Sequence, residues 1–291
     1  MDLFSTAVVA GMFLGGTYAL IALGLVLVFR ATNTFNFAHG QVMLLTAYIV
    51  GKYANGSTSS FFITFIIGLV AAAVVSTVFY LLVLRRLVGK SLFLAVIATL
   101  GLASLLDGGL GIVFSAQQYA VQNPLLPTGT LSVFGARVQA ATVAIMVVSL
   151  AVAALVAFVL QKTQLGIRVR AAGQAPLLAS QGGINVRYVY VISWATAGVL
   201  AGLAGIAYGS TNIVSPGLVE TANLALPAMM LGGLDSFVGA IVGGVLIGLL
   251  QGLTSTYVGG DHVDALTYAV LLVVLLFRPN GLYGTKIVTR V

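Results

Sequence analysis

The sequence contains no cysteine, and only two histidines and six acidic residues occur among its 291 positions. Without cysteine there is neither a disulfide framework nor a thiolate metal site, so the sequence carries no information on redox compartment. His39 and His262 lie far apart in the chain, and we expect no metal site from them. No HExxH motif, no GxSxG motif with partners and no Walker A lysine motif occurs, so we expect neither an enzyme nor a chain that binds ATP or another cofactor itself.

Charge of either sign is scarce. Only 7% of the residues are charged and 60% are hydrophobic, with a mean hydropathy of +1.12. This composition excludes an ordinary soluble domain and predicts a polytopic protein of the lipid bilayer. The net charge of +7 does not indicate a nucleic-acid partner, because most of the basic residues gather near residues 85–90, within 161–187 and after residue 277. Clusters of this kind are typical of cytoplasmic loops and ends.

The most polar stretch is the segment 161–187, QKTQLGIRVRAAGQAPLLASQGGINVR. It carries four positive charges and no acid between two long apolar runs. Because basic loops stay on the cytoplasmic side, we expect this segment to face the cytoplasm and the polar loop 115–137 to face outside. The same rule places the N-terminus outside and the C-terminus in the cytoplasm, which in a bacterium corresponds to the plasma (inner) membrane.

Apolar runs long enough for membrane helices recur along the chain. We predict one all-α transmembrane domain over residues 1–291, with eight or nine helices, some of them discontinuous. The full or shortened runs are 5–29, 42–50, 61–84, 92–114, 138–160, 189–209, 221–233, 237–258 and 263–277.

Two of these runs are interrupted. The stretch TNTFNFAHGQ at 32–41 precedes a short second helix, and 221–233 is broken by a proline and a glycine pair. Counting crossings between an external Glu220 and a cytoplasmic Arg278 requires 221–233 to cross the membrane as well. Irregular backbone at membrane depth must be buried in protein or line a wet cavity, which makes both breaks candidates for a transport pathway. A polar turn at the headgroups explains the first break equally well. The candidate pathway residues are Asn36, Phe37, His39, Gly40, Gln41, Pro227, Gly232 and Gly233.

Two further features leave alternatives open. Asp107 lies inside an apolar run, where an acid is a functional candidate. The glycines at 108, 109 and 111 favour the other interpretation, in which the helix ends there and Asp107 lies at the interface. In the run 189–209, small residues at spacings of three and four predict close packing against another helix, either of this chain or of another subunit.

A chain without its own nucleotide site must receive ATP-driven motion through contact with a partner. A short amphipathic helix from about Arg170 to Ala179 is the expected contact. Leu177, Leu178 and Ala179 would enter a groove of an ATPase, with Arg168 and Arg170 beside it. In the alternative interpretation, the arginines only anchor the loop at the headgroups.

Five stretches, taken in order, resemble the LivH-type permeases of branched-chain amino acid ABC importers. They are GGTYALIALGLVLVF (15–29), NFAHGQ (36–41), GIRVRAA with ASQGGIN (166–185), AGVLAGLAG (197–205) and LGGLDSFVGAIVGGVLIGLL (231–250). The resemblance implies a second homologous permease or a second copy as partner, two cytoplasmic ATPase subunits that bind ATP, and an external solute-binding protein. It also implies that the segment 166–185 docks on the ATPase. The candidate coupling residues are Gly166, Arg168, Arg170, Ala171, Leu177, Leu178, Ala179, Gly183, Ile184 and Asn185.

The sequence departs from the family pattern at several positions. Gln41 stands where a glutamate is usual, Gln174 and Ala175 replace an acidic pair, and Asp235 replaces a glycine. The resemblance implies import of branched-chain or related small amino acids. A urea or short-chain amide importer is the alternative of the same class, and a self-contained channel or secondary carrier is the rival from another class.

Overall fold

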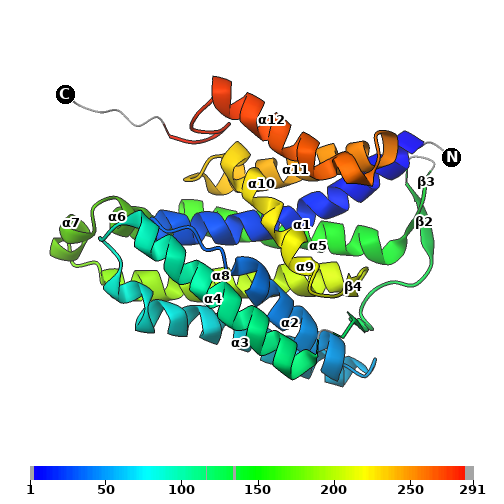
Figure 1. Cartoon of the computed structure of the whole chain (residues 1–291), viewed down its shortest axis with the longest axis horizontal. Helices are drawn as coiled ribbons and strands as arrows, with labels where there is room; N and C mark the ends of the chain where they lie inside the picture. The colour runs from blue at the N-terminus through cyan, green and yellow to red at the C-terminus, as the bar shows by residue number, and fades with distance from the viewer. Residues whose placement is uncertain (1–2, 116, 134–135, 286–291) are drawn as a thin grey trace. The chain divides into compact units, whose positions relative to one another are not determined.

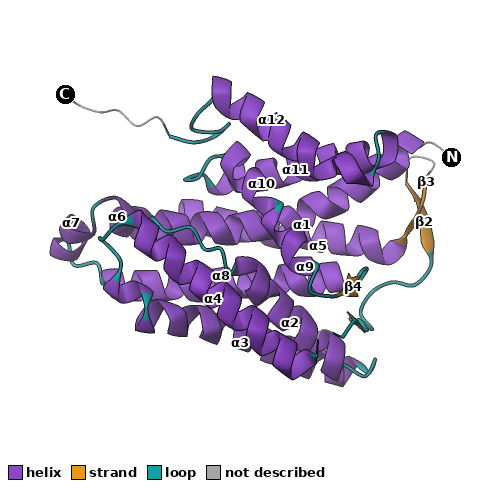
Figure 2. Cartoon of the chain, in the orientation of Figure 1, coloured by secondary structure: helices purple, strands orange, loops and turns teal. Residues whose placement is uncertain are grey.

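The structure is a computed structural model that describes residues 3–115, 117–133 and 136–285. It consists mainly of helices, with four short strands among the described residues (Figures 1 and 2). The helices and 3-10 turns are α1 (Leu3–Thr32), α2 (His39–Tyr53), α3 (Thr58–Leu82), η1 (Leu84–Arg86), α4 (Leu92–Phe114), α5 (Ala140–Lys162), α6 (Gln164–Gln174), α7 (Pro176–Gln181), α8 (Val186–Gly209), α9 (Leu218–Asn223), α10 (Ala225–Gly232), α11 (Phe237–Tyr257), η2 (Gly260–His262) and α12 (Val263–Phe277). The strands are β1 (Tyr119–Ala120), β2 (Thr130–Val133), β3 (Ala136–Gln139) and β4 (Ile213–Val214).

The prediction of a helical, multi-pass membrane protein is confirmed. Within the described residues, seven helical stretches are long and apolar enough to cross a bilayer. The 15-residue α2 and the interrupted apolar stretch Leu218–Gly232 are shorter. The predicted count of eight or nine is therefore approximate, because it depends on how these two shorter pieces are counted.

Contacts within the chain divide it into two compact units. The first, unit 1, contains residues 1–26, 128–157 and 224–291, and the second, unit 2, contains residues 27–127 and 158–223. The chain passes from one unit to the other within α1, between β1 and β2, within α5 and between α9 and α10. Each unit is described by itself below.

In unit 1, the first part of α1 packs against α11 through glycines. A Cβ atom on Gly11 would come within 2.8 Å of the Gly248 oxygen, and one on Gly248 would come within 2.2 Å of the Gly15 nitrogen. Only glycine permits this backbone approach. Near the same contact, the Tyr18 hydroxyl donates to Gln251 Oε1 at 2.7 Å, so the buried amide has a partner inside the apolar core.

Unit 2 is built around α2, which packs against α3, α4, α8 and α9. The small residues of α8 allow this packing. A Cβ on Gly205 would come within 2.3 Å of the Met43 oxygen on α2, and one on Gly198 within 2.5 Å of the Ala72 oxygen on α3. Close packing within the same chain therefore accounts for the glycines of the run 189–209.

The structure corrects the prediction of a single amphipathic helix from Arg170 to Ala179. Two helices occur instead, α6 and α7, and they are separated at Ala175, which has φ −147° and ψ 76°. Pro176 causes the break, because proline disfavours the helical conformation of the preceding residue and is well suited to the first position of a new helix.

The structure also corrects the expected end of a helix at Asp107. The helix α4 continues through Gly108, Gly109 and Gly111 to Phe114, where Ser115 adopts a left-handed conformation with φ 54°. Asp107 therefore lies within the helix, about two turns before its end. Three glycines weaken a helix but do not end one whose backbone bonds are otherwise satisfied.

The polar loop expected at 115–137 contains short antiparallel strand pairs. In unit 1, β2 pairs with β3, and in unit 2, β1 pairs with β4, aligning Tyr119 with Val214. The second pairing ties the loop to the residues that lead from α8 to α9. Positions 116, 134 and 135 of the loop lie outside the described residues.

Candidate functional site

The first interruption of the apolar runs, at residues 32–41, forms a turn between α1 and α2. Asn33 ends α1 in the left-handed region, with φ 55°, a conformation that asparagine tolerates better than most residues. The Asn36 side-chain oxygen accepts a hydrogen bond from the Ala38 amide at 3.1 Å, and the Phe35 carbonyl accepts one from the Thr99 hydroxyl at 3.2 Å. Protein groups thus satisfy several backbone polar groups of this irregular segment.

Buried polar side chains begin the short helix α2. His39 is 3% exposed and Gln41 is 5% exposed. Neither His39 Nε2 nor Gln41 Oε1 has a hydrogen-bond partner among the described residues, whereas Gln41 Nε2 donates to the Asp107 carboxylate at 3.2 Å. Gly40 lies against α9, where an added Cβ would meet Val219 and Ala222 at 3.1–3.3 Å. The predicted residues Asn36, His39, Gly40 and Gln41 are therefore close to one another and to α4 and α9.

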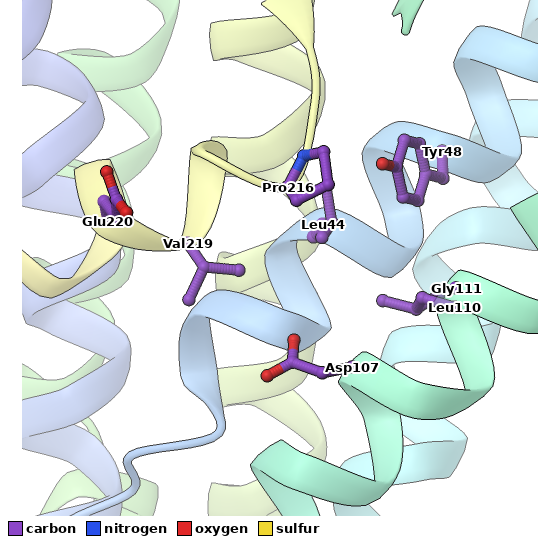
Figure 3. Close-up of a pocket in the computed structure, with 8 residues that line it drawn as sticks. All are labelled: Leu44, Tyr48, Asp107, Leu110, Gly111, Pro216, Val219 and Glu220. Carbon is purple, nitrogen blue, oxygen red and sulfur yellow. The ribbon is translucent and has the colours of Figure 1, made fainter. Parts of the chain in front are cut away.

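A cavity of about 340 Å³ lies in unit 2 between α2, α4 and the segment at α9 (Figure 3). Tyr48 and Asp107 contribute its polar groups from α2 and α4, and Glu220 contributes a carboxylate from α9. The Tyr48 hydroxyl is buried and has no hydrogen-bond partner among the described residues. The complete lining is Leu44, Tyr48, Asp107, Leu110, Gly111, Pro216, Val219 and Glu220.

Sequence reasoning named Asp107 but placed it at an interface, and it did not find Tyr48 or Glu220. The spacing of residues along each helix could have indicated which side chains share a face with Gln41 and Asp107. Leu44 and Tyr48 follow Gln41 by three and seven residues, and Leu110 and Gly111 follow Asp107 by three and four. Such spacings put side chains on one helix face, although they do not reveal which faces meet.

The second interruption was expected at Pro227 and at the pair Gly232 and Gly233, which lie in unit 1. The structure corrects its first part: Pro227 lies inside α10, near its start, where proline is tolerated, and α9 and α10 are separated at Leu224 instead. The helix α10 does end at Gly232. A Cβ on Gly232 would come within 2.0 Å of the Gly239 oxygen on α11. The carbonyls of Leu231 and Gly232 accept hydrogen bonds from Leu282 and Tyr283 amides at 2.8 and 2.9 Å. Within unit 1, this break is thus packed and hydrogen-bonded by the protein, and Gly233 adopts φ 114°, which favours glycine.

The helix α6 is held tightly at two glycines. A Cβ on Gly166 would lie 1.6 Å from the Leu160 oxygen at the end of α5, and one on Gly173 would lie 1.9 Å from the Arg30 oxygen near the end of α1. The Arg170 guanidinium donates to the Leu160 carbonyl at 3.1 Å, and the Tyr190 hydroxyl donates to the Ala172 carbonyl at 2.9 Å. These contacts fix α6 to α1, α5 and α8.

The following helix, α7, presents apolar side chains to the surroundings. Leu177 is 72% exposed and Leu178 is 66% exposed, whereas Ala179 is buried at 7%. Ala179 therefore does not share the exposed surface of the two leucines, contrary to the expected grouping. Arg168 is exposed and Ala171 is partly buried.

The end of the segment has a clear structural role. Gly183 adopts φ 82° where the chain leaves α7, and the Ile184 amide donates to the Ala179 carbonyl at 3.0 Å. The Asn185 side chain then accepts a hydrogen bond from the Tyr188 amide at 3.0 Å and caps the start of α8. These residues connect α7 firmly to a long membrane helix.

The features described so far are typical of a membrane transport subunit. They are several apolar spans, interrupted helices, a cavity with polar groups and a short helix with exposed leucines between basic residues. No group of three or more metal-ligating side chains occurs in the part of the chain that the structure describes. The chain matches, over residues 7–277, the family described as the permease component of branched-chain amino acid transport systems, and it belongs to that family.

Similar proteins include the high-affinity branched-chain amino acid transport system permease protein BraD of Pseudomonas aeruginosa, which is 29% identical over 97% of this chain and 96% of its own length. The corresponding permease protein LivH of Escherichia coli K12 is 27% identical with the same coverage. A probable LivH permease of Methanocaldococcus jannaschii is 28% identical over 91% of this chain and 88% of its own length. No solved structure matches the chain significantly.

Proposed function

We propose that the chain is the transmembrane permease subunit of an ATP-driven ABC importer for branched-chain or related small amino acids. The family match over residues 7–277 is the observation that carries this proposal. The three relatives above bear names of branched-chain amino acid systems, and they support this substrate class over urea or short-chain amides. The chain is a transport component and leaves ATP hydrolysis to its partners.

The proposed partners are two cytoplasmic ATPase subunits, an external solute-binding protein and a second permease, either homologous or identical. The exposed face of α4 supports a permease partner. Open space lies beyond Gly101, Gly108 and Gly109, where added Cβ atoms would meet nothing within 4 Å. Small residues on a membrane helix allow a second helix to approach closely.

We further propose that the segment 161–187 docks on the ATPase through the exposed leucines of α7. A movement of α7 would reach α6, which lies against the end of α1 at Gly173. The end of α1 leads directly into the turn with Asn36 and then into α2. This contact chain lies within unit 2, so it can carry motion from the ATPase to the candidate pathway residues.

The candidate pathway consists of the segment Asn36–Gln41, which includes Phe37, and, in unit 1, of Pro227, Gly232 and Gly233 in and after the short helix α10. The supporting observation for the first segment is that buried polar groups at the start of α2 lie near a cavity. For the second, it is the interruption of an apolar segment. We propose that the protein lies in the plasma membrane of a bacterium, with residues 161–187 and the C-terminus in the cytoplasm; the basic residues of both stretches support this orientation.

Uptake by the reconstituted system tests this function. Proteoliposomes with the permease, its ATPases and its solute-binding protein should accumulate radiolabelled leucine only when ATP is supplied inside, on the ATPase side. The matched controls omit ATP, omit the binding protein or replace leucine by urea or acetamide. ATP-dependent accumulation of urea or acetamide, without leucine uptake, would contradict the proposed substrate class.

A further inference from the structure

The cavity of unit 2 combines acids and an apolar wall in a small volume. Asp107 and Glu220 supply two carboxylates, and no lysine or arginine is among the residues that line it. The nearest cation on α2, Lys52, donates from Nζ to the Val113 carbonyl at 3.2 Å and lies 5.0 Å from the centre of the Phe114 ring. The charged side chains of the lining therefore favour a ligand with a positive group.

One residue of the cavity wall, Tyr48, also carries a buried polar atom without a partner among the described residues. Tyr48 is 1% exposed, its ring stacks on Phe114 at 4.9 Å, and its hydroxyl has no hydrogen-bond partner among the described residues. In Figure 3, the hydroxyl extends from α2 toward the side of Pro216. A buried hydroxyl is normally hydrogen-bonded, so this one is suited to donate to a ligand.

A second buried group holds the acid of α4 in place. Gln41 Nε2 donates to Asp107, which leaves the carboxylate acceptor capacity for another donor. Leu44, Leu110 and Val219 supply aliphatic surface beside these polar groups. A volume of about 340 Å³ lies within the range of small-molecule sites.

From this arrangement, we infer that the cavity is a binding site within the permease for an aliphatic amino acid. Asp107 accepts hydrogen bonds from its ammonium group, the Tyr48 hydroxyl donates to its carboxylate, and Leu44, Leu110 and Val219 contact its side chain. Glu220 adds negative potential at α9. This inference rests on the proposed function for the choice of an amino acid, and it assigns selectivity to the membrane subunit in addition to any binding protein.

The absence of native cysteine allows a direct test by protection from labelling. The Val219→Cys variant is assembled with its ATPases, without binding protein, in nanodiscs of phosphatidylcholine and phosphatidylglycerol, which contain no primary amine. The rate of reaction with a small neutral maleimide is measured against leucine concentration. Leucine should slow labelling at position 219, while labelling of a Leu125→Cys control in the loop 115–137 should not change. No protection at position 219, or no labelling there at all, would overturn the proposed site.

Two probes separate the two polar contacts. In the Val219→Cys background, Asp107→Asn should raise the concentration for half protection about tenfold or more, both for leucine and for 3-methylbutylamine, which lacks the carboxylate. Tyr48→Phe should raise it severalfold for leucine only. Asp264→Asn and Tyr257→Phe, both at exposed positions of unit 1, are the matched controls and should leave it unchanged.

The decisive comparison uses 4-methylpentanoate, which lacks the ammonium group. Ammonium recognition is wrong if 4-methylpentanoate protects position 219 as well as 3-methylbutylamine does. It is also wrong if leucine protects position 219 of the Asp107→Asn variant at the same concentration as without this substitution. Leucine uptake by the unmutated reconstituted system is measured in parallel. Uptake without protection contradicts the cavity site alone, whereas failure of leucine uptake contradicts the proposed function.

Discussion

At the scale of single residues, some buried polar side chains bond the backbone, and others keep a polar atom without a partner among the described residues. Asn36 accepts from the Ala38 amide and shapes the entry to α2, whereas buried His39 and Gln41 retain polar atoms without partners among the described residues. A buried polar atom left unpaired costs about 1–3 kcal/mol, so such groups are expected at positions where a substrate passes or binds.

Alanine at Asn36 or His39 should therefore lower leucine uptake while leaving binding of the ATPase intact. Asn36→Ala removes the acceptor for the Ala38 amide, at a cost of about 1 kcal/mol in the turn, and Asn36→Ser should restore part of the uptake because its hydroxyl can accept the same bond. Uptake in proteoliposomes and co-purification of the ATPase measure the two effects. Normal uptake in both alanine variants would remove these residues from the pathway.

At the scale of helices, a close contact between α6 and the end of α1 constrains the segment 161–187. Gly173→Ala would place a methyl group where the Arg30 oxygen lies, at 1.9 Å. Relief of this overlap requires α6 to move, at a cost of about 1–3 kcal/mol. We expect a lower thermal midpoint and reduced uptake.

The matched control is Gly182→Ala in the same segment. Its Cβ would meet only ordinary contacts at 3.5 Å, and its φ of −77° suits any residue. If both variants show the same midpoint and the same uptake as the unmutated chain, the contact between α6 and α1 transmits nothing.

The sequence predicted those helices whose limits depend on local composition. The bounds 263–277 are those of α12, because the apolar run ends there at Arg278 and Pro279. The apolar run 92–114 has the bounds of α4, although the favoured interpretation ended that helix near Asp107. The break at Ala175 was missed although Pro176 was visible, because the alanines and leucines on both sides favour a continuous helix. The cavity could not be predicted, since it arises only where faces of α2, α4 and α9 meet in tertiary packing.

At the scale of the whole molecule, the orientation in the membrane is a prediction from charge alone. In a chain without native cysteine, Gln174→Cys and Gln122→Cys place one thiol each at exposed positions of α6 and of the loop 115–137. An impermeant maleimide added to intact cells should label position 122 and leave position 174 unlabelled, while lysed cells should show labelling of both. Labelling restricted to position 174 in intact cells would reverse the orientation.

The central claim is that an ATPase drives this permease through the exposed leucines of α7. The most direct measurement is the ratio of leucine imported to ATP hydrolysed in proteoliposomes that carry the double variant Leu177→Asp and Leu178→Asp. Both side chains are exposed, so the variant should insert normally, but charge in the apolar contact should release the ATPase or abolish uptake per ATP hydrolysed. Leu125→Asp, at a 53% exposed leucine in the loop 115–137, makes the same chemical change and should behave as the unmutated protein. A double variant that retains its ATPase and the normal ratio would contradict the account.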